Sequence, residues 1–375
     1  MTGLREALRD LADQAPTADL ADLAEVAVTG HRRRRLGVTV LGAALAVTTL
    51  AAVAVLQGVR GAEGAETAES ADRRQRTPEP DPLPERGAGP VSFAYLRECD
   101  FDGETRERDC SKTGWRVVTA AGRVYSVPGA MARTADHGSV PLAISRDGRK
   151  IAYYSREAGA HVVRDLGSGA VTTSPVRIPE KRIGRPGGTL TLSDDGRHLA
   201  FDPREGSKEP GLLIDVTNGK TVQLHRKYEP VAIKDGIVSL VRYVKTDLWL
   251  MPVTGGGKPV RFPGAYIGFS ELAPDGRTVA AVLHKDYLRA GPRLLTLLDT
   301  KTGKVVRKVA LRASGWARGA FVQVVRWQSA TEVVIDVGKG PELYSADLRT
   351  GRTKKIVTRG PTSQMATLPG QPSSG

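Results

Sequence analysis

The sequence is poor in the residues that build most catalytic and metal sites. Its 375 residues include two cysteines and six histidines. No pair of histidines has the H-x-x-x-H or H-E-x-x-H spacing of a zinc site. The segment 268–272, GFSEL, lacks the closing glycine of a serine hydrolase nucleophile elbow. We therefore predict no catalytic residue, no metal and no cofactor, and we expect that the chain is not an enzyme.

Long hydrophobic runs are also scarce, with one exception at Leu36–Val59. This stretch carries no formal charge, and at about 1.5 Å per helical residue it exceeds the ~30 Å hydrocarbon core of a bilayer. His31 and four arginines precede it, and acidic residues dominate the other flank. The positive-inside bias then places the N-terminus in the cytoplasm. The sequence predicts a single-pass protein of the cell membrane whose C-terminal domain is extracytoplasmic.

Two other interpretations of this run fit less well. A cleaved signal peptide has a shorter leading region and an apolar core of about 7 to 15 residues, and Arg34 and Arg35 resemble a twin-arginine pair only because they lie in an arginine run. A buried core helix is usually shorter than 18 residues. The anchor remains the expectation.

The flanking segments suggest a layout of five parts. Residues 1–35 show helical spacing of leucines around Pro16 and predict a cytoplasmic amphipathic segment that needs a partner. Residues 60–90 are rich in Pro, Glu and Ala and predict a disordered linker. A β domain is expected over 91–360 and a disordered tail over 361–375.

Short β-rich runs with Asp-Gly turns fill the segment from Val91 onward. Asp-Gly between two such runs is a strong hairpin signal, and these pairs begin at Asp147, Asp195, Asp235 and Asp275. A second pair of strands follows each hairpin, so the repeat holds four strands in about 40 to 50 residues, the period of propeller blades. We predict an all-β, six-bladed β-propeller, or seven blades if a strand set lies near 131–140.

The hairpins resemble a known family. Segments 145–153 (SRDGRKIAY), 193–201 (SDDGRHLAF) and 273–280 (APDGRTVA) are similar to the S-P-D-G-x-x-I-A-F signature of TolB-like, WD40-like (PD40-type) propeller repeats. The proline is kept only in Pro274, and the segment around Asp235 departs from the pattern. The resemblance implies the propeller fold and says little about function, since the motif is a turn and an inner strand pair.

The two cysteines, Cys99 and Cys110, flank a turn between two predicted strands. Because the domain is expected to face an oxidising exterior, we predict a disulfide between them; two free thiols are the alternative. Acidic residues between them suggest a calcium loop, but the EF-hand spacing is not met.

Positive charge is concentrated in the predicted propeller. Residues 91–375 hold 44 of the 55 Lys and Arg and 28 of the 41 Asp and Glu. The predicted topology keeps this charge away from nucleic acid, so an anionic cell-envelope polymer, lipid head groups or a protein partner are expected, with a solvated surface as the alternative. Two basic loops that should share one face supply the candidate binding residues Arg204, Lys208, Lys285 and Arg289.

These observations favour a membrane-anchored ligand- or protein-binding module that acts as a sensor or scaffold. A second hypothesis is a transmembrane regulator whose N-terminal helices bind a cytoplasmic protein. Its layout resembles anti-sigma-like membrane proteins of high-GC Gram-positive bacteria, although it lacks their His-Cys zinc motif. A propeller enzyme of unknown chemistry is the third.

Overall fold

The computed structural model describes residues 79–101, 108–184, 187–203, 209–243, 245–287, 293–312, 322–337, 342–358 and 366–374. The predicted cytoplasmic segment, the predicted span at 36–59 and most of the predicted linker lie outside these residues. Within them, no helix is both long enough and apolar enough to cross a membrane.

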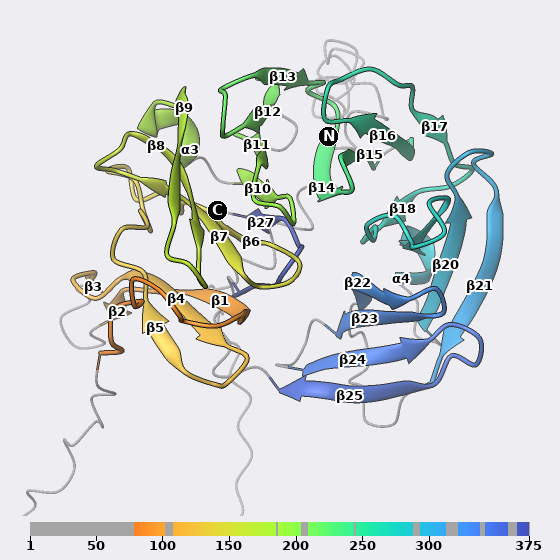
Figure 1. Cartoon of the computed structure of the whole chain (residues 1–375). Helices are drawn as coiled ribbons and strands as arrows, with labels where there is room; N and C mark the ends of the chain where they lie inside the picture. The colour runs from red at the N-terminus through yellow and green to blue at the C-terminus, as the bar shows by residue number, and fades with distance from the viewer. Residues whose placement is uncertain are drawn as a thin grey trace, which may run out of the picture.

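Six sheets of antiparallel strands surround a central axis (Figure 1). Blades 1 to 3 are built as follows, from the inner to the outer strand: β26 (Ala366–Thr367), β1 (Val91–Arg97), β4 (Gly114–Thr119) and β5 (Val124–Ser126); β6 (Leu142–Ile144), β7 (Lys150–Ser155), β8 (Ala160–Asp165) and β9 (Val171–Arg177); β27 (Ser373–Ser374), β10 (Thr189–Leu192), β11 (His198–Asp202), β12 (Gly211–Asp215) and β13 (Thr221–Leu224).

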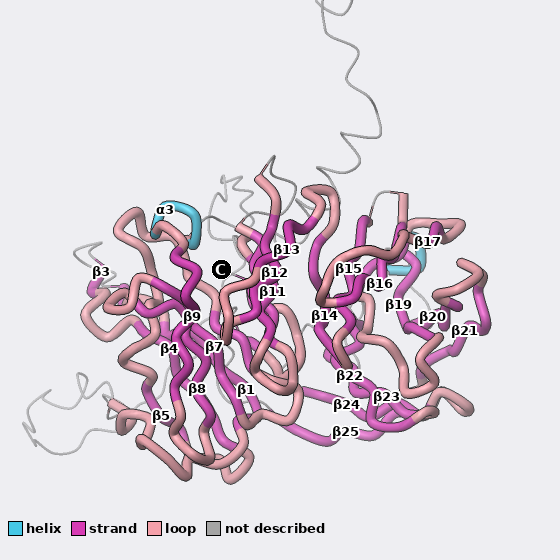
Figure 2. The backbone as a smooth tube through the Cα atoms, turned by 45° about the horizontal axis from the view of Figure 1, so that its top comes forward, coloured by secondary structure: helices cyan, strands magenta, loops and turns pink. Residues whose placement is uncertain are grey.

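Blades 4 to 6 each have four strands, in the same inner-to-outer order: β14 (Glu229–Lys234), β15 (Ile237–Arg242), β16 (Asp247–Pro252) and β17 (Val260–Arg261); β18 (Tyr266–Ile267), β19 (Thr278–Leu283), β20 (Arg293–Asp299) and β21 (Val305–Leu311); β22 (Val322–Ser329), β23 (Glu332–Val337), β24 (Glu342–Asp347) and β25 (Thr353–Thr358). A small hairpin of β2 (Asp100–Phe101) and β3 (Arg108–Asp109) and the short helices α3 (Glu180–Ile183) and α4 (His284–Tyr287) complete the described elements (Figure 2).

The predicted all-β fold with six blades is therefore confirmed. The segment 131–140, where a seventh blade was considered, contributes one isolated bridge between Arg133 and Ser139 rather than a strand set. The four Asp-Gly turns adopt the expected geometry, because each glycine has a positive φ, between +65° and +73°.

Hydrophobic side chains fill the spaces between neighbouring blades. Six clusters of buried residues occupy the six interfaces between consecutive blades. The cluster that closes the ring joins Phe93 of blade 1, Val325 of blade 6 and Leu368 from the C-terminal segment. Inner strands are buried on both faces, which explains why β10 reads as fully buried whereas the outer strand β9 is largely exposed.

A second turn motif, D-x-x-x-G, joins the third and fourth strands of blades 2, 3, 5 and 6. In blades 2, 3 and 5 this aspartate pairs with a cation of the first hairpin: Lys150 with Asp165, Arg197 with Asp215 and Arg277 with Asp299. Asp215 accepts two hydrogen bonds from Arg197, at 2.9 and 2.8 Å, and these hold the pKa of Asp215 at about 2. In blade 6, Asp347 pairs with Arg349 of its own turn instead. The ion pair therefore joins the two hairpins in blades 2, 3 and 5.

The glycine of this turn packs against the preceding blade. A Cβ added to Gly303 would lie 2.2 Å from the carbonyl oxygen of Arg261, and one added to Gly351 would lie 2.0 Å from that of Ala310. Both carbonyls belong to the preceding blade's outer strand. A side chain cannot fit there, so glycine is required at the contact as well as by its positive φ.

Two predicted boundaries differ from the structure. Within the expected linker, Leu83 is buried, Pro82 forms a bridge with Ser126 of blade 1, and Ala88 bonds to Leu166 of blade 2, so residues 79–90 pack on these two blades. Within the expected disordered tail, residues 366–374 include β26 and β27, which pair with β1 and β10. Both segments have few large apolar residues; backbone pairing and ring closure order them instead.

His161 of β8 is a buried histidine without a polar partner in the described part of the chain. Its side chain is fully buried, and neither ring nitrogen forms a hydrogen bond with a described residue. Its ring packs edge-on against Tyr154, with centroids 5.4 Å apart, and beside Phe201. Burial lowers the pKa of His161 to about 4.

We predict that His161 makes the fold sensitive to mild acid. The unfolded chain takes up a proton near pH 6.5 and the folded chain only near pH 4, so stability is complete above about pH 6.5 and declines as the pH falls toward 4. Urea unfolding should show a loss of about 2 kcal/mol between pH 7 and pH 5. His161→Leu should remove most of this loss; an unchanged pH dependence would contradict the assignment.

Gly303→Ala should be more damaging than Gly276→Ala. Both glycines lie in blade 5 with φ of +70° and +65°, but a Cβ at Gly276 meets nothing within 4 Å. Both variants carry the same cost of a positive φ, so that cost cancels when their free energies of unfolding are compared. Gly303→Ala should be less stable than Gly276→Ala by about 1 to 3 kcal/mol because of its clash with the preceding blade. Chemical denaturation of both variants measures the difference, and equal destabilisation would show that the contact between the blades can relax to accommodate the added methyl group.

Candidate functional site

Polar side chains converge near the propeller axis, five of them from the end of an inner strand or the segment that follows it and one from within β22. We call the following six residues the channel cluster: Arg146, Asp194, Lys234, Glu271, Arg326 and Gln371. Blades 2 to 6 supply the first five, and the C-terminal segment after β26 supplies the sixth. The inner strands place them together because equivalent ends of propeller strands meet at the same face.

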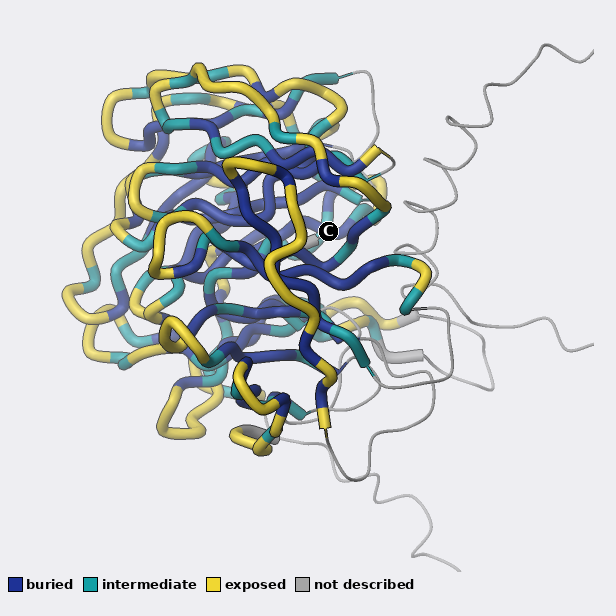
Figure 3. Tube along the Cα trace, turned by 90° about the vertical axis from the view of Figure 1, so that its right-hand side faces the viewer, coloured by how far each residue is buried: buried dark blue, intermediate teal, exposed yellow. Residues whose placement is uncertain are grey.

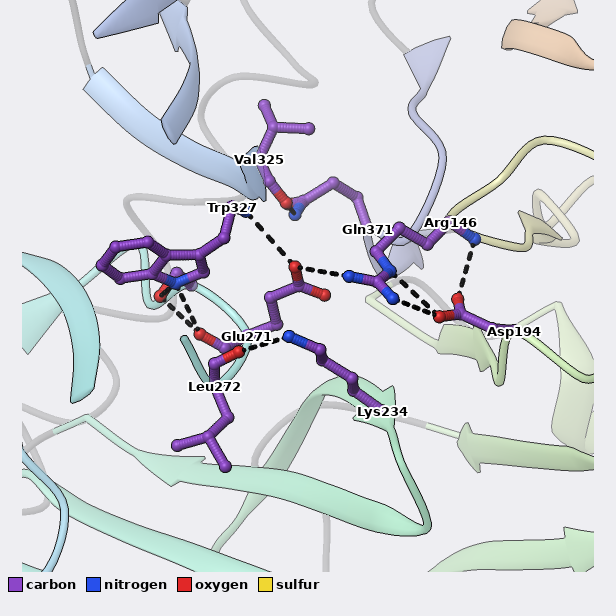
Figure 4. A network of polar contacts seen from close by, with 9 residues as sticks. Arg146, Asp194, Lys234, Glu271, Leu272, Val325, Trp327 and Gln371 are labelled. Carbon is purple, nitrogen blue, oxygen red and sulfur yellow. Dashed lines mark hydrogen bonds and ion pairs between the residues drawn. The ribbon is translucent and has the colours of Figure 1, made fainter. Parts of the chain in front are cut away.

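Arg146 lies at the centre of the contacts in this cluster (Figure 4). Its Nε and Nη2 atoms lie 2.9 and 2.8 Å from Oδ2 of Asp194, and its backbone N–H donates to Oδ1 at 3.1 Å. Its Nη1 lies 3.4 Å from Oε1 of Glu271. Burial disfavours the charge on Arg146, but the two carboxylates more than offset it and raise its pKa.

Glu271 is the most deeply buried acid of the channel cluster, with 5% of its side chain exposed. Its Oε1 atom also accepts a hydrogen bond from the backbone N–H of Trp327, at 3.2 Å. The Trp327 indole in turn donates to Ser270 Oγ and to the Glu271 carbonyl, both at 3.1 Å. Burial raises the pKa of Glu271, and the nearby charges of Arg146 and Lys234 oppose that rise.

Lys234 and Gln371 are held by hydrogen bonds to uncharged acceptors and donors. Lys234 donates to the carbonyl oxygen of Leu272 at 2.8 Å. Gln371 accepts a hydrogen bond from Gln323 at 2.9 Å and donates its amide to the carbonyl of Val325. That carbonyl is available because Val325 lies at a bulge of β22, opposite no residue of β23.

Arg326 differs from the other cations of the channel cluster. It follows the bulge and is half-buried, and in the described part of the chain its guanidinium forms neither a hydrogen bond nor an ion pair. Burial lowers the pKa of Arg326, Arg146 adds to that effect, and Glu271 opposes it. A guanidinium nevertheless keeps its proton in proteins and retains all five donors.

The channel cluster combines charged and polar groups of the kind that can take part in polar recognition. Among the described residues, no group of three or more His, Cys, Asp or Glu side chains is arranged to hold a metal ion. Hydrogen-bond donors dominate, since Arg326 is uncommitted and Lys234 has donors beyond its bond to Leu272. The arrangement can bind a group that accepts hydrogen bonds and carries negative charge.

The residues singled out from the sequence have different outcomes. The predicted disulfide between Cys99 and Cys110 is confirmed, with Cα atoms 4.2 Å apart. Of the predicted basic face, Arg204, Lys208 and Arg289 lie outside the described residues, and Lys285 is exposed on α4. That face stays a prediction.

The sequence analysis missed the channel cluster. Arg146, Asp194 and Lys234 occupy the same position of the hairpin motif, the second residue of S-x-D-G or its equivalent, where the resembled family has proline. A charged residue replacing proline in three consecutive blades was the signal that could have identified them.

Comparisons with known proteins support no closer relationship than the fold. No family model matches the chain, and no curated protein matches it. Matching solved structures include TolB from Acinetobacter baumannii, at 16% identity and a TM-score of 0.45 over 74% of this chain and 66% of that one. Virginiamycin B lyase from Staphylococcus aureus matches at 9% identity and 0.44, over 75% and 93% of the two chains.

A third match is the dihydro-heme d1 dehydrogenase NirN, at 17% identity and a TM-score of 0.39, where the alignment covers 76% of this chain and 59% of that one. NirN and the lyase are enzymes with this fold, and they contradict the prediction, drawn from missing catalytic motifs, that this chain is not an enzyme. The scarcity of catalytic motifs did not exclude catalysis, because propellers place reacting groups in space from separate blades. The fold alone does not show an enzymatic activity either.

We predict that the pKa of Glu271 responds in opposite directions to the loss of two of its charged neighbours, Arg146 and Asp194. Arg146→Gln removes a cation and should raise it further, whereas Asp194→Asn removes an anion and should lower it. Carbon-detected NMR titration of the Glu271 carboxyl measures both shifts. Movement in the same direction for both variants would contradict the described cluster.

Proposed function

We propose that this chain is a membrane-anchored binding module, and that the channel cluster recognises a ligand carrying a carboxylate or another small anionic group. The propeller fold is compatible with a binding module. The single observation that carries the finer proposal is the uncommitted guanidinium of Arg326 at the end of the channel.

The charge balance of the channel cluster supports an anionic ligand. Asp194 is matched by Arg146 through several short contacts, and Glu271 is matched by Arg146 and the backbone N–H of Trp327. Arg326 adds a positive charge that no carboxylate in direct contact neutralises. A carboxylate can accept two parallel hydrogen bonds from a guanidinium, and such bonds are stronger than those between neutral groups.

Neighbouring groups would supply selectivity for the rest of the ligand. The Gln371 amide is held on both of its polar atoms, so it presents a fixed edge rather than a rotating one. Glu271, a buried acid of the same cluster, would repel a second negative charge on the ligand. We therefore propose a ligand with one anionic group rather than a polyanion.

The placement of this module outside the cytoplasm is part of the proposal. The uncharged run Leu36–Val59 and its preceding arginines support a single span with the propeller on the exterior. The Cys99–Cys110 disulfide supports the same side, because such bonds persist mainly in oxidising compartments.

A paired set of compounds tests the proposed recognition. Galacturonic acid and N-acetyl dipeptides with a free C-terminal carboxylate should be compared with their primary amides in thermal-shift and calorimetric titrations of the full chain. The acids should bind about 10 to 100 times more tightly than the amides, the factor expected for a charged hydrogen bond.

Arg326→Gln should reduce acid binding to the level of the amides without lowering the melting temperature, since the guanidinium makes no bond in the described structure. Exposed Arg226 provides the matched control as Arg226→Gln, which should bind as the wild type does. Equal binding of acids and amides, or full binding by Arg326→Gln, would refute the proposed anionic recognition.

A further inference from the structure

The outer wall of blades 5 and 6 carries an excess of positive charge. The segment from the end of the third strand through the fourth has five basic and one acidic residue in blade 5 (299–312), and four and one in blade 6 (347–358). The corresponding segments of blades 1 to 4 (120–126, 165–177, 215–224 and 252–261) have five basic and two acidic residues together. We call the following exposed residues the basic rim: Lys301, Lys304, Arg307, Lys308, Arg312, Arg349, Arg352, Lys354 and Lys355.

The basic rim is continuous across the two blades. Arg307 donates to the carbonyl of Leu348, and the backbone N–H of Arg312 donates to the Gly351 carbonyl at 2.7 Å. Arg312 and Arg352 thereby form a bridge, with two like-charged residues side by side. Figure 3 views the molecule from the side of β20 and β21 and shows exposed residues along the outer strands and turns.

Most of this charge has no partner among the residues that the structure describes. Arg349 lies 3.5 Å from Asp347, Lys355 pairs with Glu342, and Arg307 is bound to a carbonyl. The side chains of the other six form no ion pair or hydrogen bond within the described residues. Like charges placed opposite each other destabilise a sheet, so the arrangement of Arg312 and Arg352 favours an external counter-charge.

Protection of exposed strand edges does not explain the basic rim. Lysines on edge strands commonly prevent sheets from pairing with other chains. Every blade has such an edge, yet the outer strand β13 of blade 3 carries no charge at all. Positive charge concentrated in two adjacent blades points instead to a directional contact.

Exposed apolar side chains lie beside the basic rim and indicate which type of partner it binds. Val305, Val306 and Ile356 are 40%, 58% and 38% exposed. They stand next to Arg307 and Lys355 in β21 and β25. Basic residues interleaved with apolar ones are typical of surfaces that enter the interface of an anionic bilayer. We infer that the basic rim docks the edge of the propeller on an anionic membrane surface.

This inference is independent of the channel cluster. Hydrogen exchange of the full chain should be measured with nanodiscs of phosphatidylcholine and with nanodiscs of about three parts phosphatidylglycerol to seven parts phosphatidylcholine. Amides of β21 and β25 should exchange about tenfold more slowly with the anionic discs, and about 1 M salt should remove the difference. Equal exchange with both discs would overturn the inference.

Two variants with equal charge change separate the basic rim from net charge. The first variant should abolish the protection, because each removed charge should lower the membrane affinity about fivefold. It combines Lys304→Gln, Lys308→Gln, Arg352→Gln and Lys354→Gln. Lys112→Gln, Lys220→Gln, Arg226→Gln and Lys227→Gln together change exposed residues elsewhere and should preserve the protection. Loss in both variants, or in neither, contradicts the assignment. Equal protection by soluble polyphosphate at the same phosphate concentration also overturns the assignment to a membrane.

Discussion

Closure of the ring by the C-terminal segment is the constraint on which the rest of the structure depends. Two residue pairs join β26 to β1, Ala94 with Thr367 and Tyr95 with Ala366. Leu368 then enters the hydrophobic cluster between blades 6 and 1, and the Gly370 N–H donates to Ile144 of blade 2. The same segment delivers Gln371 to the channel before it pairs with blade 3. Ring closure and the composition of the channel cluster therefore have a common cause.

Charge is distributed in two different ways in this propeller. In the channel, acids and bases from five blades lie close together, and each is paired with a charge or a carbonyl except Arg326 within the described residues. On the outer wall of blades 5 and 6, most cations of the basic rim have no counter-charge among the described residues. A paired cluster with one uncommitted guanidinium suits a small ligand of defined shape, whereas an extended unpaired surface suits a broad anionic partner.

Much of the fold was predictable, because Asp-Gly turns and apolar runs are local features with a regular period. The channel cluster was harder to predict. Arg146, Asp194 and Lys234 share one motif position and were visible in the sequence, but Arg326 reaches the site only through the bulge at Val325. Gln371 was missed because 366–374 lacks the apolar residues that predict order, and its pairing depends on strands more than 150 residues away. The basic rim was not predicted because its residues belong to two separate outer strands and turns, which only the packing of blade 5 against blade 6 brings side by side.

The central claim is that Arg326 is an accessible, uncommitted cation in the channel, and arginine-specific labelling of the native full chain tests it most directly. After brief treatment with phenylglyoxal, mass spectrometry should find Arg326 modified and Arg146 spared, since Arg146 is held by Asp194 and Glu271. An acid from the paired compound set should slow modification of Arg326, and its amide should not. An unreactive Arg326, or equal reactivity with the acid present, would contradict the account.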